Sequence, residues 1–137
     1  MYYSFEESFY EGKPVLELLE DGKPMFEETD GRIKRLIFGI KKAKMFICCL
    51  DQIKAFCESE GGKPPINSTI LIEDKENNLK CYCERRNHFI NRYGKEINRP
   101  YLRIQSGKTR ISFGLKKAKG ILFLSDQIED FIEEYSQ

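Results

Sequence analysis

The chain lacks most features that identify an enzyme or a membrane protein from its sequence. Its 137 residues include one histidine, His88, and no glycine-rich phosphate loop, Ser-His-Asp set or paired-carboxylate motif. No apolar run approaches the roughly 18 to 20 residues of a spanning helix, and residues 1–7 carry acid where a secretory signal carries base. We therefore expect a non-catalytic, cytoplasmic protein with no membrane segment. The alternative is an enzyme whose site is assembled across distant parts of the chain.

The cysteines do not form a disulfide pattern. They are odd in number, and two of them are adjacent within an apolar segment, where a free thiol acts as a small hydrophobic group. The five are Cys48, Cys49, Cys57, Cys81 and Cys83. A zinc site would need the last three with His88, but Cys-x-Cys is not the usual Cys-x-x-Cys spacing. The sequence predicts reduced cysteines, no metal and no cofactor.

The most informative feature that is present is an internal repeat. Residues 38–44 (FGIKKAK) recur as residues 113–119 (FGLKKAK), and the DQIxxF segment at 51–56 recurs at 126–131, with a constant offset of 75. Ten of the nineteen positions from Phe38 to Phe56 are identical in the second copy. A repeat of this kind indicates a duplicated structural unit.

Each copy of the repeat is expected to follow short strands. Alternating segments bounded by turn residues occur at 14–19, 24–26 and 35–38, and again at 69–72, 80–85, 100–104 and 110–113, with a longer insertion at 87–98. This predicts an α+β fold with two tandem repeats: residues 1–61, a Gly- and Pro-rich linker at 62–68, and residues 69–137. Since about 60 to 70 residues bury too little core alone, we expect pseudo-twofold packing around one shared core, in a monomer or a homodimer.

The segment after each Phe-Gly pair allows two interpretations. Apolar residues recur at helical spacing from Ala43 to Cys57 and from Ala118 to Ile132, which favours one long amphipathic helix in each repeat. The first would end at residues 60–62, where glycine supplies a left-handed cap. The competing interpretation places a strand at 121–124 and begins a shorter helix at Asp126.

This motif resembles one in a group of small bacterial and phage proteins that carry a single unit of this kind and have no assigned function. The resemblance rests on Phe-Gly-x-Lys-Lys-Ala-Lys, an apolar stretch and Ile-x-x-Phe, preceded by GKPVLEL at residues 12–18. It covers most of the first unit and the last third of the second, and it implies no activity. Duplicated strand-and-helix units also occur in PUR-type and positive-cofactor-type single-strand binders, which is an analogy of fold only.

Charge is segregated along the chain, although the formal net charge is only +1. Residues 1–30 contain nine acids and two lysines, whereas residues 75–119 contain thirteen basic residues and three acids. Aromatic residues are interleaved with the basic ones, as in proteins that stack bases and bind phosphates of a single strand. The candidates are Tyr82, Arg85, Arg86, Arg92, Tyr101 and Arg103. Alternatively, the tyrosines face a core and the arginines form a solvated surface.

The lysine-rich helix starts suggest a second kind of anion site. Three lysines in the first turn oppose the helix dipole unless an anion is bound there. They are Lys41, Lys42 and Lys44 in the first copy and Lys116, Lys117 and Lys119 in the second. The alternative is that acids such as Glu27, Glu28 or Asp30 lie over these lysines within the molecule.

These patterns favour a non-catalytic nucleic-acid-binding protein whose partner is single-stranded DNA or RNA. The alternative is a protein-interaction or regulatory module of phage origin, in which the acidic and basic faces each bind a protein.

Overall fold

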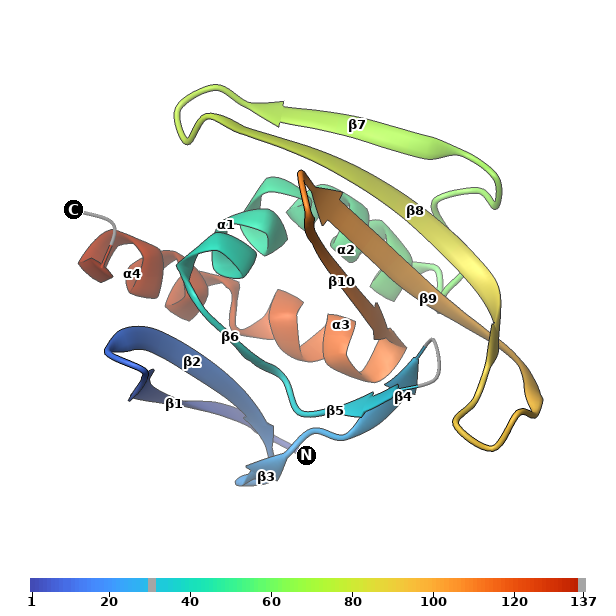
Figure 1. Ribbon diagram of the computed structural model, residues 1–137, viewed down its shortest axis with the longest axis horizontal. Helices are drawn as coiled ribbons and strands as arrows, with labels where there is room; N and C mark the ends of the chain where they lie inside the picture. The colour runs from blue at the N-terminus through green and yellow to red at the C-terminus, as the bar shows by residue number, and fades with distance from the viewer. Residues whose placement is uncertain (30–31, 136–137) are drawn as a thin grey trace.

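The computed structural model describes residues 1–29 and 32–135 and confirms an α+β fold. Two antiparallel sheets lie on either side of a layer of helices (Figure 1). The strands are β1 (Tyr3–Tyr10), β2 (Lys13–Glu20), β3 (Lys23–Pro24), β4 (Glu27–Thr29), β5 (Arg32–Lys34), β6 (Ile37–Phe38), β7 (Thr69–Asp74), β8 (Leu79–Ile90), β9 (Glu96–Ser106) and β10 (Thr109–Gly114). The helices are α1 (Ile40–Cys48), α2 (Leu50–Glu58), α3 (Leu115–Phe123) and α4 (Ser125–Tyr135).

The first sheet is built around β2. Strand β1 pairs along the whole of β2 through a tight turn in which Glu11 and Gly12 both have positive φ, the geometry that suits a two-residue hairpin. The opposite edge of β2 is shared by β3 and β6, so that Leu16 pairs with Phe38. Between β3 and β6 the chain forms the small β4–β5 hairpin. This hairpin lies beside β10 of the second sheet.

The second sheet is a four-stranded meander with the order β10-β9-β8-β7. The sequence marks residues 87–98 as an insertion, but most of them continue β8 and β9 into a long hairpin. A register shift between Arg86 and His88 marks the point where this hairpin leaves the main sheet.

Both copies of the repeated motif are helical, but neither sequence interpretation is fully correct. No strand forms at 121–124, and each helix is divided in two, at Cys49 and at Leu124. Helical hydrogen bonds cross the division, since Cys49 N–H donates to the Met45 carbonyl. The end of α2 is as expected, because Gly61 has a positive φ and its N–H donates to the Phe56 carbonyl. None of the helices in the described residues has the length and apolar character needed to cross a membrane.

The helices of the two halves pack against one another. Helix α1 packs on α4 and α2 packs on α3, while α3 and α4 also contact β2 and α1 contacts β7 and β8. One buried cluster therefore contains residues from both halves, including Leu16, Phe46, Leu102 and Ile128.

The same order of elements occurs twice in the described residues. The series β1-β2-β6-α1-α2 matches β8-β9-β10-α3-α4, and the pair Leu16 with Phe38 matches the pair Leu102 with Phe113. The first half adds β3, β4 and β5, and the second half adds β7. The unit boundaries and the twofold relation remain predictions, but this correspondence provides a common frame for comparing the two motifs.

Candidate nucleic-acid interface

The outer face of the second sheet is open, because the helices cover only its other side (Figure 1). Cross-strand pairing places Leu71, Tyr82, Gln105 and Arg110 in one row across all four strands. All four side chains are exposed, with Tyr82 at 43%. The row thus presents an accessible aromatic ring on the same face as a guanidinium group.

The next row of this face has partly compensated charges. Glu84 pairs with Arg103 across the strands, and its Oε1 lies 3.8 Å from Arg103 Nη1 and 3.7 Å from Arg86 Nε. Two arginines therefore share one carboxylate. These residues keep a net positive charge while their side chains are held in position on the sheet.

Two predicted binding residues have structural roles instead. The Tyr101 side chain is 2% exposed and its ring packs edge-on against Phe89, with 5.8 Å between ring centroids, so it is not available to stack on a base. Arg85 is half-buried and donates to the Pro64 carbonyl at 2.6 Å and to Asn87 at 2.7 Å. For Tyr101 the alternative of a core-facing strand residue is correct.

The tip of the β8–β9 hairpin extends the basic surface. Arg92 is exposed and lies over the ring of Tyr93, 4.8 Å from its centroid. His88 Nε2 lies 2.6 Å from Glu96 Oε1 across the hairpin. This cross-strand pair gives the single histidine a contact within the hairpin.

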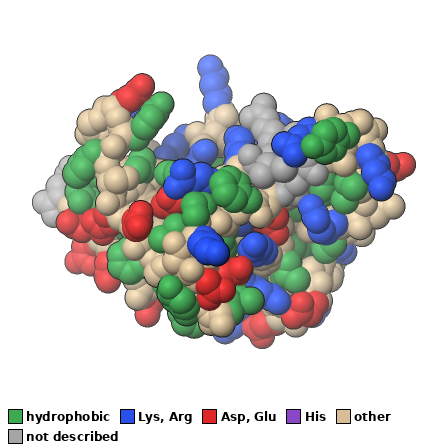
Figure 2. All heavy atoms as spheres, turned by 90° about the horizontal axis from the view of Figure 1, so that it is seen from below, with side chains coloured by type: hydrophobic (Ala, Val, Ile, Leu, Met, Phe, Trp, Pro, Cys, Tyr) green, Lys and Arg blue, Asp and Glu red, His purple; other side chains and the backbone are tan. Residues whose placement is uncertain are grey.

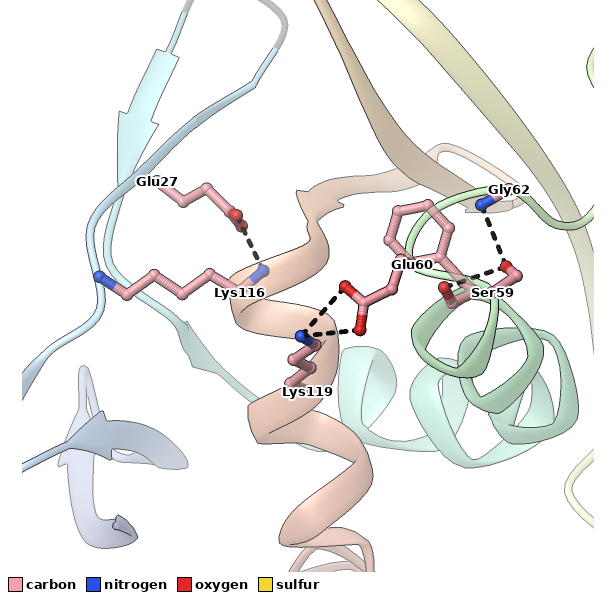
Figure 3. Close-up of polar contacts among 7 residues, drawn as sticks. Glu27, Ser59, Glu60, Gly62, Lys116 and Lys119 are labelled. Carbon is pink, nitrogen blue, oxygen red and sulfur yellow. Dashed lines mark hydrogen bonds and ion pairs between the residues drawn. The ribbon is translucent and has the colours of Figure 1, made fainter. Parts of the chain in front are cut away.

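The start of α3 is already occupied by a carboxylate from the first half. Glu27 on β4 accepts hydrogen bonds from the backbone N–H groups of Gly114 at 2.8 Å and Lys117 at 3.4 Å. It also accepts one from the Lys116 N–H at 3.1 Å (Figure 3). A Cβ at Gly114 would lie 2.6 Å from Glu27 Oε2, so this close approach requires glycine. The predicted anion site of the second motif is therefore filled by an internal acid.

Two other lysines of the second motif also have acidic partners. Lys116 lies 3.6 Å from Glu20, and Lys119 lies 3.4 Å from Glu60 (Figure 3). The intramolecular-acid alternative thus holds for this copy. Asp30 and the side chain of Glu28, the other acids that the sequence offers as partners, lie outside the described part of the chain.

The start of α1 differs from that of α3. Gly39 adopts nearly the same backbone conformation as Gly114, but among the described residues no side chain accepts a hydrogen bond from the first N–H groups of α1. Lys41 is exposed, and Lys42 and Lys44 are half-buried. The burial of the two sets of lysines therefore differs at one position, where Lys42 is half-buried and its counterpart Lys117 is buried.

A cavity of about 390 Å³ lies where the two motifs meet, between β6 and β10. Equivalent residues of the two copies face each other across it: the offset of 75 that relates Phe38 to Phe113 also relates Lys42 to Lys117 and Arg35 to Arg110. Phe46 completes the apolar part of the lining together with the two other phenylalanines.

The cavity is rich in positive charge and, among the described residues, has no acidic lining residue. The basic side chains are Lys34, Arg35, Lys42, Arg110 and Lys117. Burial and the nearby charge of Lys34 lower the pKa of Lys42. Burial also lowers the pKa of Lys117, a shift opposed by Glu27. Lys117 is 4% exposed and its ammonium group donates to the Lys34 carbonyl.

One acid determines which cavity arginine is neutralised. Arg35 makes a bidentate ion pair with Glu17, at 2.8 and 2.6 Å. Glu17 pairs with Ile37 on β6, and the equivalent position beside Ser112 on β10 is Arg103. Arg110 therefore lacks the acid that neutralises Arg35.

Three thiols meet in the core between α1 and β8. The Sγ atoms of Cys48, Cys49 and Cys81 all lie within 4.8 Å of one another. Burial raises the pKa of Cys48 to about 12, so these groups are held as neutral thiols. The sequence grouped Cys57, Cys81 and Cys83 with His88 instead. The observed cluster could not be predicted, because only the tertiary fold brings the end of α1 beside β8.

Sequence reasoning missed Lys34, Arg35 and Arg110 as residues that line one cavity. For the two arginines the available signal was the repeat itself, since extending the 75-residue offset upstream of Phe38 aligns Arg35 with Arg110, whereas Lys34 aligns with Thr109. It could not show that both strands border one cavity.

The segregation of charge along the sequence is also visible on the surface. In Figure 2, which views the molecule from below, the left side shows mainly acidic side chains, whereas the centre and right show most of the basic ones, interspersed with acidic side chains. The left side corresponds to the β1–β2 and α4 end in Figure 1, and the right side to the β8–β9 hairpin end.

Comparison with protein-family models, curated proteins and solved structures finds no match to this chain.

Proposed function

We propose that this protein is a non-catalytic binder of single-stranded nucleic acid, and that the strand lies on the outer face of the second sheet. The observation that carries the proposal is the open row from Tyr82 to Arg110, flanked by Arg86 and Arg103. Exposed rings on a sheet stack on bases, and neighbouring guanidinium groups bind the phosphates between them.

The extended hairpin fits the same function. Arg92 at its tip continues the positive surface beyond the edge of the sheet. A strand that follows the sheet toward the hairpin therefore meets positive charge along its path, and electrostatic attraction of this kind is independent of base sequence.

Binding of a labelled single-stranded oligonucleotide, measured by fluorescence anisotropy between about 50 and 200 mM salt, tests the proposal. The affinity should fall with salt, with a log–log slope of about −2 if three phosphates are neutralised. Unlabelled duplex DNA should compete poorly, because its bases are not free to stack. No binding at low salt, or an affinity independent of salt, would overturn the proposal.

A matched pair of tyrosine variants tests the stacking surface. Tyr82→Ala should weaken binding by about 1 to 3 kcal/mol, the contribution of one stacked base. Tyr10→Ala removes a tyrosine that is 67% exposed at the acidic end and should have no effect. Equal losses in the two variants would exclude the Tyr82 face.

A second candidate function is a protein-interaction module. Large exposed rings occur at Phe9 (65%), which contacts Tyr135 of α4, and at Phe123 (68%), which contacts Tyr3 of β1. Exposed aromatic groups are enriched in protein-binding surfaces. This candidate predicts that Phe9 and Phe123 variants lose a protein partner while nucleic-acid binding is unchanged.

A further inference from the structure

The cavity between β6 and β10 is connected to the proposed strand-binding face through Arg110. This residue ends the exposed row that begins at Leu71 and Tyr82, and it also lines the cavity. A chain that crosses the sheet along this row therefore arrives at the cavity entrance.

The lining of the cavity suits a dianion. Lys34, Lys42 and Arg110 have no acidic partner among the described residues, and Lys117 adds a fourth cation that is buried. An internal phosphodiester carries one negative charge, whereas a terminal phosphate carries close to two at neutral pH. Converging like charges are destabilising unless a ligand neutralises them, and a terminal phosphate would neutralise more of them.

The dimensions of the cavity suit the end of a strand. A volume of about 390 Å³ lies in the range of small-ligand sites. Its inner side is closed by the rings of Phe38, Phe46 and Phe113, which belong to the hydrophobic core. A strand can therefore enter the cavity but cannot continue through it, and these rings offer apolar surface to the terminal nucleotide.

We infer that this cavity binds the terminal phosphate of a nucleic-acid strand, with Lys34, Lys42, Arg110 and Lys117 as its ligands. The inference rests on the proposed function, because the rest of the strand lies on the sheet. Its consequence is that the protein recognises strand ends rather than internal segments.

Three oligonucleotides of identical sequence test the inference: one with a 5′-phosphate, one with a 3′-phosphate, and one with hydroxyl groups at both ends. An internal label keeps both ends free. One phosphorylated form should bind about tenfold or more tightly than the hydroxyl form, the gain expected from charge-assisted hydrogen bonds to the additional charge. Equal affinity of all three would overturn the inference and leave the proposed function intact. No binding of any of them would overturn both.

A pair of adjacent lysines provides the matched control. Lys42→Gln should abolish the preference for the phosphorylated end while the hydroxyl form binds nearly as before. Lys41→Gln, which changes an exposed lysine of the same helix turn that does not line this cavity, should keep the preference. Arg110→Gln changes an exposed strand position and should also reduce the preference. It tests the same site if the Lys42 variant does not fold. Retention of the preference in folded Lys42→Gln and Arg110→Gln proteins would overturn the assignment.

Discussion

The carboxylate of Glu27 should contribute measurably to stability, because it joins the first half of the chain to the start of α3. It accepts two hydrogen bonds of ordinary length, from Gly114 at 2.8 Å and Lys116 at 3.1 Å, and a longer one from Lys117. It also places negative charge at the positive end of a nine-residue helix. Glu27→Ala removes both effects and leaves a buried N–H at Gly114 without its partner.

The expected loss follows from these contacts. An unpaired buried donor costs about 1 to 3 kcal/mol, and the charge–dipole interaction of a partly exposed group adds about 0.3 to 1 kcal/mol. We expect Glu27→Ala to lower the free energy of unfolding by about 1 to 4 kcal/mol, and Glu27→Gln, which keeps one acceptor, by a smaller amount, about 1 to 2 kcal/mol. Urea denaturation measures both. Glu129→Gln, an exposed acid on α4, is the control and should change little.

Two glycines test the same contact from the other side. Neither Gly114 nor Gly39 has a positive φ, so alanine is not strained by backbone conformation at either position. At Gly114 the new Cβ would displace Glu27, whereas at Gly39 it would lie 3.7 Å from the Pro14 carbonyl, an ordinary contact. Gly114→Ala should therefore destabilise the protein, and it should cost much less when Glu27 is already alanine. Similar unfolding free energies for Gly39→Ala and Gly114→Ala, with no effect of Glu27→Gln, would refute this reasoning.

Three further predictions concern the shared core. Ile53→Ala and Ile128→Ala should each cost about 2 to 5 kcal/mol in urea denaturation, because both side chains are fully buried at equivalent positions; losses near zero would contradict their placement. A chain ending at Gly62 loses the helices that cover β2 and should unfold or form a dimer, so a folded monomer in sedimentation would exclude the shared core. Cys48, whose pKa is raised to about 12, should react with iodoacetamide at pH 8 about a thousandfold more slowly in the native than in the denatured protein; equal rates would show that the thiol is accessible and ionised.

The sequence was sufficient to predict the class of fold, several of its turns and the end of one helical segment. The turn residues correctly separated the strands that were expected, and Gly61 correctly ended the first helical segment, because both depend on local backbone geometry. Strands β1, β4 and β5 were not predicted. The division of each helical segment at Cys49 and Leu124 was not predicted. The helices on either side of each division pack on different helices of the other half, α1 on α4 and α2 on α3, and such tertiary packing leaves no local signal.

The candidate site was less predictable for the same reason. The interleaving of aromatic and basic residues selected Tyr82, which is exposed, but also Tyr101, which packs against Phe89 beyond the register shift in β8. The cavity was not foreseen because its lining comes from segments about 75 residues apart. Only the packing of the two halves brings Lys42 and Lys117 to one place.

The two sides of the cavity differ because two acids of the first half, Glu17 and Glu27, have no counterpart in the described residues of the second half. Glu17 neutralises Arg35, whereas the corresponding strand position in the second half is Arg103, so Arg110 has no equivalent partner. Glu27 lies on the β4–β5 hairpin, which has no counterpart between β9 and β10. It therefore caps the N-terminus of α3, and the second half, as far as the structure describes it, supplies no equivalent acid to α1. Repeated positions supply cations to both sides of the cavity, and these unshared acids determine which of the cations are available to a ligand.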